Sequence, residues 1–415
     1  TFTAYKIFNV SYSGTNYAYT LDQAFDGFLS YDGNTYENAE AFISALEGMT
    51  ANSPLMDELS AKLYAYIQTG PAGLVSYSAT AGAGPDVPSV TIDGIPLGYY
   101  LVYGSAVNEG EDVSGDPITN TIVASCALTT TDPNSSITPK VDAPSIHKEV
   151  EHHAGDGVWQ DWTDVNIGDQ VNFRISTAVP NRRGYNATTR PYSFTVHDVM
   201  SPGLTLDPGS IVVKLNGVPL TVENDYTVTT NHSGKAPTED TEITITFNSS
   251  EFITYTTGAP IVITYSATLN DQAVIADVGN PNRVQLEYST NPYLPSKGRT
   301  PWSWVRVYTY KIDIFKYTGD LDDASPPVSG AKFKLCRSSD GTQPVFFTLI
   351  TEGSYTVKKT GTVSAGGVDG DEIIVSPASG LIHIKGLDAG RYYLIETAAP
   401  KGFHLNSTPV EIKIE

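Results

Sequence analysis

Five polar side chains occupy positions at which the surrounding strand pattern predicts an apolar, inward-facing surface. Side chains two residues apart in a strand share a face. Lys148, for example, stands between Ile146 and Val150 on one predicted face. The five residues are Lys148, Asp198, Asn282, Lys316 and Glu396. A buried lysine or carboxylate is costly unless it is paired or neutral, so this recurrence indicates a chemical role.

A lysine, a carboxyl group and an asparagine amide buried together can form an amide bond between two side chains. Desolvation disfavours the ammonium of a buried lysine and leaves a nucleophilic amine. It also favours a neutral carboxyl, which can hydrogen-bond to the amide carbonyl and polarise it. Attack by the amine expels ammonia while the carboxyl transfers the protons, and the fold keeps the groups together. The alternative for each residue singly is a strand-end side chain whose charged head reaches solvent.

The elements that must position these residues are strands. Strand patterns begin at residue 146 and run to about residue 300, with a hairpin signal at Asn216-Gly217. A proline-rich linker at 129–145 precedes them, and a second break follows at 291–301. A final strand-rich unit begins at about residue 305. Spacing and turn signals therefore predict three β-sandwich domains in a row, a mainly β fold.

The first stretch, to about residue 128, also carries the only clear helical patterns. One helix is predicted after Asn38, and a second after Ser53-Pro54. Their apolar stripes are formed by Phe42, Ile43 and Leu46 and by Leu55, Leu59, Leu63 and Tyr66. We expect both helices to pack on a sheet, whose strands are predicted over 1–10, 87–95 and 97–106.

Composition narrows the class of protein. Twenty-five Lys and Arg against 46 Asp and Glu give a net charge of −21, which argues against nucleic-acid and anionic-membrane partners. Two cysteines exclude a disulfide-rich scaffold and a multi-cysteine zinc site. Abundant Tyr, Gly and Pro are typical of a β-rich extracellular protein. No apolar run is long enough to span a membrane, and we expect a trimmed, mature fragment without a signal peptide.

Several strings resemble the backbone (major) pilins of Gram-positive, sortase-assembled pili. SGAKFKL at 329–335 and GRYYLIETAAPKGF at 390–403 are similar to the B-type collagen-adhesin (CnaB-like) domain, the second string to its E-box. VNIGDQVNFRI, FTVHDVMSPGLTL and GNPNRVQLEYSTNP, from residue 165 onward, resemble the A-type (CnaA-like) isopeptide domain. The resemblance implies three tandem immunoglobulin-like domains of CnaB, CnaA and CnaB type at 1–140, 141–303 and 304–415.

The resemblance also implies roles for individual residues. Asp198 and Glu396 would catalyse isopeptide formation, Lys148 would link to Asn282, and Lys316 would be the linking lysine of the last domain, whose asparagine partner is not in this chain. Lys140, in ITPK at the end of the first domain, would be the pilin-motif lysine that attacks the sortase acyl-enzyme. Asn291 and Asn280 remain alternatives to Asn282. Tyr103 stands where the first domain would need a glutamate, so no isopeptide bond is expected there.

The implied protein is a structural shaft subunit and not an enzyme acting on substrates. Its partners would be other copies of itself, a pilus-class sortase, and tip and basal pilins, with no cofactor, metal, nucleic acid or membrane bound by this fragment. It would lie outside the cell in a wall-anchored pilus. The main alternative is a surface adhesin for matrix protein or glycan, and a third is a carbohydrate-active enzyme using carboxylates and the four tryptophans.

Weaker signals have simpler interpretations. The histidines at 147, 152 and 153 suggest a metal site, but adjacent histidines in a strand point to opposite faces, so a solvated segment is favoured. The acidic runs at 320–323 and 367–372 lack EF-hand spacing and are predicted to be surface turns. Cys126 and Cys336 lie in different predicted domains and are interpreted as unpaired buried thiols.

Overall fold

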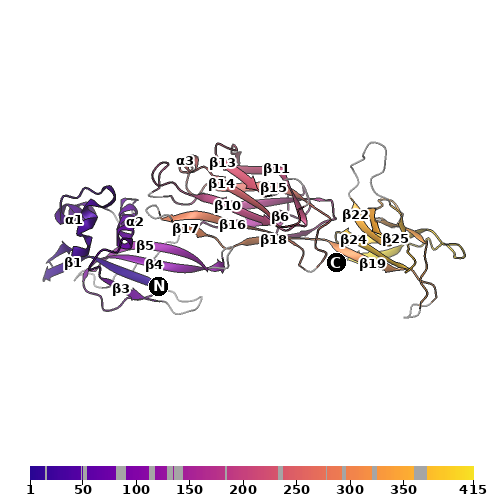
Figure 1. Cartoon of the computed structure of the whole chain (residues 1–415), viewed down its shortest axis with the longest axis horizontal. Helices are drawn as coiled ribbons and strands as arrows, with labels where there is room; N and C mark the ends of the chain where they lie inside the picture. The colour runs from indigo at the N-terminus through magenta and orange to yellow at the C-terminus, as the bar shows by residue number, and fades with distance from the viewer. Residues whose placement is uncertain are drawn as a thin grey trace.

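The computed structural model shows an elongated molecule in which three strand-rich units follow one another along the long axis (Figure 1). It describes the chain except for residues 15, 48, 50–53, 81–89, 112–116, 129–133, 135–143, 183–184, 232–236, 277, 292–295, 320–324 and 359–371. Strands account for 49% of the residues and helices for 11%, so the mainly β class is confirmed. Among the helices of the described part, none has the length and apolar character needed to cross a membrane.

The first unit is a five-stranded antiparallel sheet covered by helices. Its strands are β1 (Phe2–Ser13), β2 (Asn16–Leu21), β3 (Ser76–Ala79), β4 (Gly98–Glu111) and β5 (Pro117–Leu128). The covering helices are η1 (Gln23–Gly33), α1 (Ala39–Glu47) and α2 (Pro54–Gln68). Phe8 of β1, Phe28 of η1, Phe42 of α1 and Leu63 of α2 meet in one core. The predicted packing of two helices on a sheet is therefore confirmed, with the 3₁₀ segment η1, kinked at Tyr31 and Asp32, as an additional element.

Local chemistry accounts for where these helices begin. The side chain of Asn38 accepts a hydrogen bond from the Ala41 amide at 2.9 Å, which satisfies a free amide at the start of α1. At the start of η1, the side chain of Asp22 accepts a hydrogen bond from the Ala24 amide at 3.2 Å. The strand predicted over 87–95 is wrong for its described part, because residues 90–95 form no strand. The two neighbours of β4 in the sheet are β1 and β5, and β5 pairs with β4 along most of its length.

The middle unit is a two-sheet sandwich. The seven-stranded sheet consists of β13 (Tyr226–Thr230), β14 (Thr241–Phe247), β10 (Phe194–Met200), β16 (Asn280–Asn291), β18 (Ser303–Tyr308), β8 (Trp162–Asp164) and β17 (Ser296–Arg299), which pairs with β16. The six-stranded sheet consists of β12 (Val218–Pro219), β11 (Leu204–Leu215), β15 (Pro260–Leu269), β9 (Gln170–Ala178), β6 (Ile146–Glu151) and β7 (Trp159–Gln160). The short α3 (Ser249–Phe252) follows β14.

Alternation along these strands sets the two faces of the sandwich. In β9, every second residue from Val171 to Thr177 is buried. In β14, every second residue from Thr241 to Phe247 is likewise buried. The predicted hairpin at Asn216-Gly217 is confirmed: both residues have positive φ, 51° and 81°, as a tight two-residue turn requires, and they join β11 to β12. The buried apolar residues of both sheets form a single core.

The last unit contains two four-stranded sheets. One consists of β19 (Tyr310–Phe315), β24 (Leu381–Leu387), β22 (Ser354–Lys358) and β21 (Phe346–Thr351), and the other of β23 (Ile374–Val375), β20 (Lys332–Cys336), β25 (Gly390–Ala398) and β26 (Val410–Ile414). β18 pairs within the middle unit and β19 within the last one, with only Thr309 between them. We therefore propose Thr309 as the junction of these units. The junction proposed from sequence at 140 lies outside the described residues.

Candidate functional site

Four strands of the middle unit place polar side chains between its two sheets. Lys148 on β6 and Tyr265 on β15 come from the six-stranded sheet. Asp198 on β10 and Asn282 on β16 come from the seven-stranded sheet, on adjacent antiparallel strands. All four are almost completely excluded from solvent, with exposed fractions of 0%, 3%, 1% and 0% respectively. The structure thus brings together the three residues that the sequence singled out in this unit.

The four side chains form one hydrogen-bonded cluster. The Lys148 side-chain nitrogen Nζ contacts Asp198 Oδ2 directly and lies 2.7 Å from the Tyr265 hydroxyl. The Tyr265 hydroxyl lies 3.0 Å from each carboxylate oxygen of Asp198. Asn282 Nδ2 donates to the same hydroxyl at 2.8 Å. The lysine, the carboxyl group and the amide are therefore all connected through the phenol of Tyr265.

Burial shifts the protonation of the pair toward its neutral form. Desolvation lowers the pKa of Lys148, and the neighbouring Asp198 only partly opposes that shift. Desolvation raises the pKa of Asp198 in turn, against the opposing effect of Lys148. The amine nitrogen also lies over the rings of Tyr265 and Phe173, 4.9 and 5.4 Å from their centroids. These ring faces would attract an ammonium, but the larger effect of desolvation favours an uncharged amine beside a protonated carboxyl.

The amide of Asn282 is only partly satisfied. Its Oδ1 is buried and has no hydrogen-bond partner among the described residues. The sequence suggested that the carboxyl would hydrogen-bond to this carbonyl, but Asp198 instead contacts Lys148 and Tyr265. An unsatisfied buried carbonyl is unfavourable in a purely structural amide, which normally fills its hydrogen-bonding capacity. Gln285 Oε1 on the same strand is likewise buried without a partner among the described residues, so Asn282 is distinguished by its place in the cluster.

The neighbouring Asn280 shows the contrast. It is equally buried, but its Oδ1 accepts from the Val274 amide at 2.9 Å. Its Nδ2 donates to the carbonyls of Val274 and Val307 at 3.2 and 3.0 Å. A β-carbon on Gly203 would lie 2.1 Å from its Oδ1, so the glycine makes room for it. Asn280 ties a loop to the sheet, and the side chain of the other alternative, Asn291, lies outside the described residues.

Sequence reasoning missed Tyr265. In IVITYSATL it stands at the same two-residue spacing as Ile261 and Ile263, so strand alternation already placed its hydroxyl on the inward face. A buried tyrosine hydroxyl usually finds a hydrogen-bond partner. From this need for a partner, the sequence could have predicted a polar side chain opposite the Tyr265 hydroxyl.

The last unit pairs the other two predicted residues. Lys316, directly after β19, places its Nζ 3.1 Å from Oε1 of Glu396 on β25. Glu396 Oε2 accepts from the Asn406 amide at 3.0 Å. The side chain of Glu396 is buried, but that of Lys316 remains 27% exposed. This pair therefore contacts solvent on its lysine side, unlike the pair in the middle unit.

The other residues singled out in the sequence are Tyr103, Lys140, two acidic segments and two cysteines, and the structure describes only some of them. Tyr103 stacks on Tyr64 with ring centroids 4.3 Å apart and so fills an aromatic position in the first unit. Lys140 and the acidic segment at 320–323 lie outside the described residues, as does the run at 367–372 except for Glu372, whose carboxylate lies 2.6 Å from Lys334 Nζ. Cys336 is buried and unpaired, while the side chain of Cys126 is outside the described part. Within the described ranges, no group of three or more His, Cys, Asp or Glu side chains could hold a metal ion.

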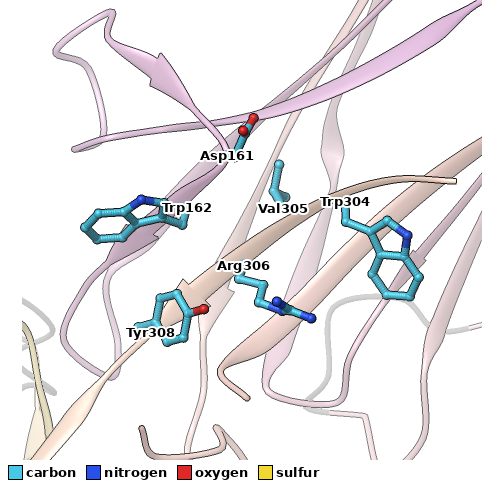
Figure 2. A pocket seen from close by; sticks show the side chains of 6 residues that line it. All are labelled: Asp161, Trp162, Trp304, Val305, Arg306 and Tyr308. Atoms are coloured by element: carbon cyan, nitrogen blue, oxygen red, sulfur yellow. The ribbon is translucent and has the colours of Figure 1, made fainter. Parts of the chain in front are cut away.

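A second feature is a surface depression of about 430 Å³ on the outer face of β8 and β18. Figure 2 shows its lining residues, which are Asp161, Trp162, Trp304, Val305, Arg306 and Tyr308. Trp162 and Trp304 are 51% and 44% exposed. Asp161 contributes the one carboxylate of this lining, so the depression does not supply the carboxylate pair that a glycosidase uses.

Comparison with known proteins assigns two of the three units. Residues 167–292 match the family model described as Gram-positive pilin backbone subunit 2, Cna-B-like domain. Residues 320–415 match the prealbumin-like fold domain. The middle unit is thus classed as Cna-B-like by its family model, whereas its strings had suggested the A-type domain.

The similar proteins are surface proteins of Gram-positive bacteria. The trypsin-resistant surface T6 protein of Streptococcus pyogenes serotype M6 is 25% identical over 293 residues, which are 66% of this chain and 46% of that protein. The match thus spans less than half the length of that relative.

Two solved structures share the fold over the full length of this chain. The T6 backbone pilin of S. pyogenes has a TM-score of 0.58 at 19% identity, with 77% of that chain covered. The major pilin SpaA of Corynebacterium diphtheriae has a TM-score of 0.53 at 17% identity, with 90% covered. A stretch that matches the Gram-positive pilin-backbone model is thus followed by one that matches the prealbumin-like domain, and the chain is a homologue of the T6 protein.

Proposed function

We propose that this protein is a shaft subunit of a covalently polymerised surface pilus, stabilised by an isopeptide bond between Lys148 and Asn282. The observation that carries the proposal is the buried cluster of lysine, carboxyl and amide between the two sheets of the middle unit. The similarity of the chain to pilin proteins supports the assignment to a pilus. An amide cross-link also accounts for a large extracellular protein that has only two cysteines.

The proposed bond follows from the protonation states in the cluster. The neutral amine of Lys148 attacks Cγ of Asn282, the Nζ–Cγ bond forms, and the Cγ–Nδ2 bond breaks. Ammonia leaves, having gained one proton that originates on Nζ. Asp198, held in its protonated form by burial, returns to that form at the end. The folded sandwich supplies most of the rate by holding amine and amide together.

Intact-mass measurement tests the cross-link. We expect the purified protein to be lighter than its sequence by one ammonia, and Lys148→Ala or Asp198→Ala to restore the full mass. Lys316→Ala is the matched control, because its lysine also contacts a carboxylate, and it should retain the deficit. A wild-type mass equal to that of the plain sequence would refute the bond.

Polymerisation is proposed to occur through Lys140, which joins each subunit head-to-tail to the next with the help of a pilus-class sortase. The Lys140→Ala variant, expressed with its sortase, should lose the ladder of high-mass polymers, whereas the exposed-lysine control Lys401→Ala should keep it. A ladder that persists in Lys140→Ala would assign the linkage to another lysine.

The proposal also covers where the subunit lies and which proteins it contacts. The subunit would lie outside the cell in a wall-anchored pilus, in contact with other copies of itself and with tip and basal pilins. Glu396 would catalyse a second isopeptide bond that starts from Lys316. Of the domain limits proposed from sequence, 1–140, 141–303 and 304–415, the first junction is kept, and the second moves from 303/304 to Thr309.

The depression in Figure 2 favours the alternative function, an adhesin for glycan or matrix protein. Exposed indole rings flanked by an arginine and an aspartate resemble the stacking and hydrogen-bonding groups that sugar ligands use. A glycan array and immobilised matrix proteins, probed with wild type and with Trp162→Ala/Trp304→Ala, test it. Binding that the double variant loses would support adhesion, and equal signals from both proteins would exclude this surface.

A further inference from the structure

The Tyr265 hydroxyl is the common hydrogen-bonding partner of every reacting group in the cluster. It lies 2.7 Å from Lys148 Nζ, 3.0 Å from both oxygens of Asp198, and 2.8 Å from Asn282 Nδ2. A phenol has one proton to donate and lone pairs to accept with. Here it donates to the carboxyl group and accepts from the lysine and the amide, so its capacity is fully used.

The position of this hydroxyl matters because Nδ2 is the leaving group. The amide nitrogen must gain a proton before it can depart as ammonia. Within the described part of the chain, the carboxyl group of Asp198 makes no hydrogen bond to Nδ2, whereas the Tyr265 hydroxyl bonds to both Asp198 and Nδ2. The shortest hydrogen-bonded route from the carboxyl to the leaving nitrogen therefore runs through the phenol.

We propose that Tyr265 is a catalytic proton relay between Asp198 and the leaving nitrogen of Asn282. In the tetrahedral intermediate, Nδ2 becomes a basic amine, and the hydroxyl reverses its hydrogen bond and donates its proton there. It takes the carboxyl proton of Asp198 in the same step, and Asp198 recovers a proton from the newly bonded Nζ. One proton has then moved from Nζ to Nδ2, and Tyr265 and Asp198 end as they began. This inference rests on the proposed Lys148–Asn282 bond.

The surroundings of Tyr265 suit a relay that stays neutral. Burial, and then the nearby Asp198, raise the pKa of Tyr265 well above its ordinary value. The phenol therefore retains a proton at neutral pH and passes one on only as it receives another. Its ring packs on Phe173 at 5.2 Å between centroids, which fixes the hydroxyl in place independently of its hydrogen bonds.

The test follows the rate of ammonia loss in Tyr265→Phe, which keeps the ring and removes only the hydroxyl. The protein is first isolated in denaturant before the bond has formed. It is then refolded, and intact mass is recorded with time. We expect the rate to fall about 100-fold or more, the usual contribution of a positioned acid or base. Tyr192→Phe, at a tyrosine buried in the same unit but outside the cluster, should react like wild type.

Two further measurements separate the possible outcomes. In the Asn282→Ala background, which cannot cross-link, Tyr265→Phe should still give a folded protein by circular dichroism. Replacement of Tyr265 by fluorotyrosines of increasing acidity should change the reaction rate in step with phenol acidity, which a purely structural hydroxyl would not do. Equal rates for Tyr265→Phe and wild type, or no dependence on acidity, would overturn the relay. Failure of wild type itself to lose ammonia would instead refute the bond.

Discussion

The middle and last units place the same two chemical groups together in different environments. In the middle unit, Lys148 and Asp198 are 0% and 1% exposed and share a hydroxyl partner and an amide. In the last unit, Glu396 is buried but Lys316 keeps 27% of its side chain in solvent. Solvent stabilises an ammonium, whereas burial in the sandwich favours the free amine. The difference teaches that burial, more than the lysine–carboxylate contact, favours the uncharged amine that the proposed attack requires.

The largest expected effect is loss of the cross-link itself. Asn282→Ala should destabilise the middle unit by about 5 kcal/mol, because the loop between Lys148 and Asn282 exceeds the 100 residues for which the entropy model gives about 4.7 kcal/mol. Chemical denaturation followed by circular dichroism measures it. Asn280→Ala is the matched control on the same strand, and should cost about 1–3 kcal/mol for its lost hydrogen bonds. Similar losses in the two variants would contradict a covalent bond at Asn282.

A smaller effect tests whether the buried pair is neutral. In the Asn282→Ala background, Lys148→Met should cost about 1–3 kcal/mol, because a protonated Asp198 then loses a hydrogen bond without being left charged. Removal of one partner from a buried charged pair costs about 3–5 kcal/mol. A loss in that higher range, in the same denaturation experiment, would show that the two groups are ionised and would weaken the contrast with the last unit.

The smallest effect is expected in the last unit. Lys316→Met should change the free energy of unfolding by about 0–1 kcal/mol, since a partly solvated ion pair contributes little. Thermal unfolding of the variant beside wild type measures it. Glu396→Gln is the companion variant, because it preserves an acceptor for the Asn406 amide. A loss above about 2 kcal/mol in Lys316→Met would place Lys316 in the same class as Lys148.

Several features could be read from local sequence because their causes are local. Strand alternation predicted the inward direction of Lys148, Asp198 and Asn282, and the Asn216-Gly217 turn depends on two adjacent residues. The cap at Asn38 likewise satisfies an amide three residues away. The strand expected over 87–95 failed in its described part because β-propensity depends on the available partner strand, and β1 and β5 take the two edges of β4.

What the sequence alone determined is which residues face inward and which side-chain types could react. Only the tertiary structure decided which of them meet. Lys148 is 50 positions from Asp198 and 117 from Tyr265, and the two sheets that carry these residues touch only when the sandwich closes. It also decided that Asn282 bonds to Tyr265 in the buried cluster while Asn280 ties a loop, and that Lys316 stays partly exposed. Contacts across a core depend on how whole sheets pack, so no pattern within a single strand encodes them.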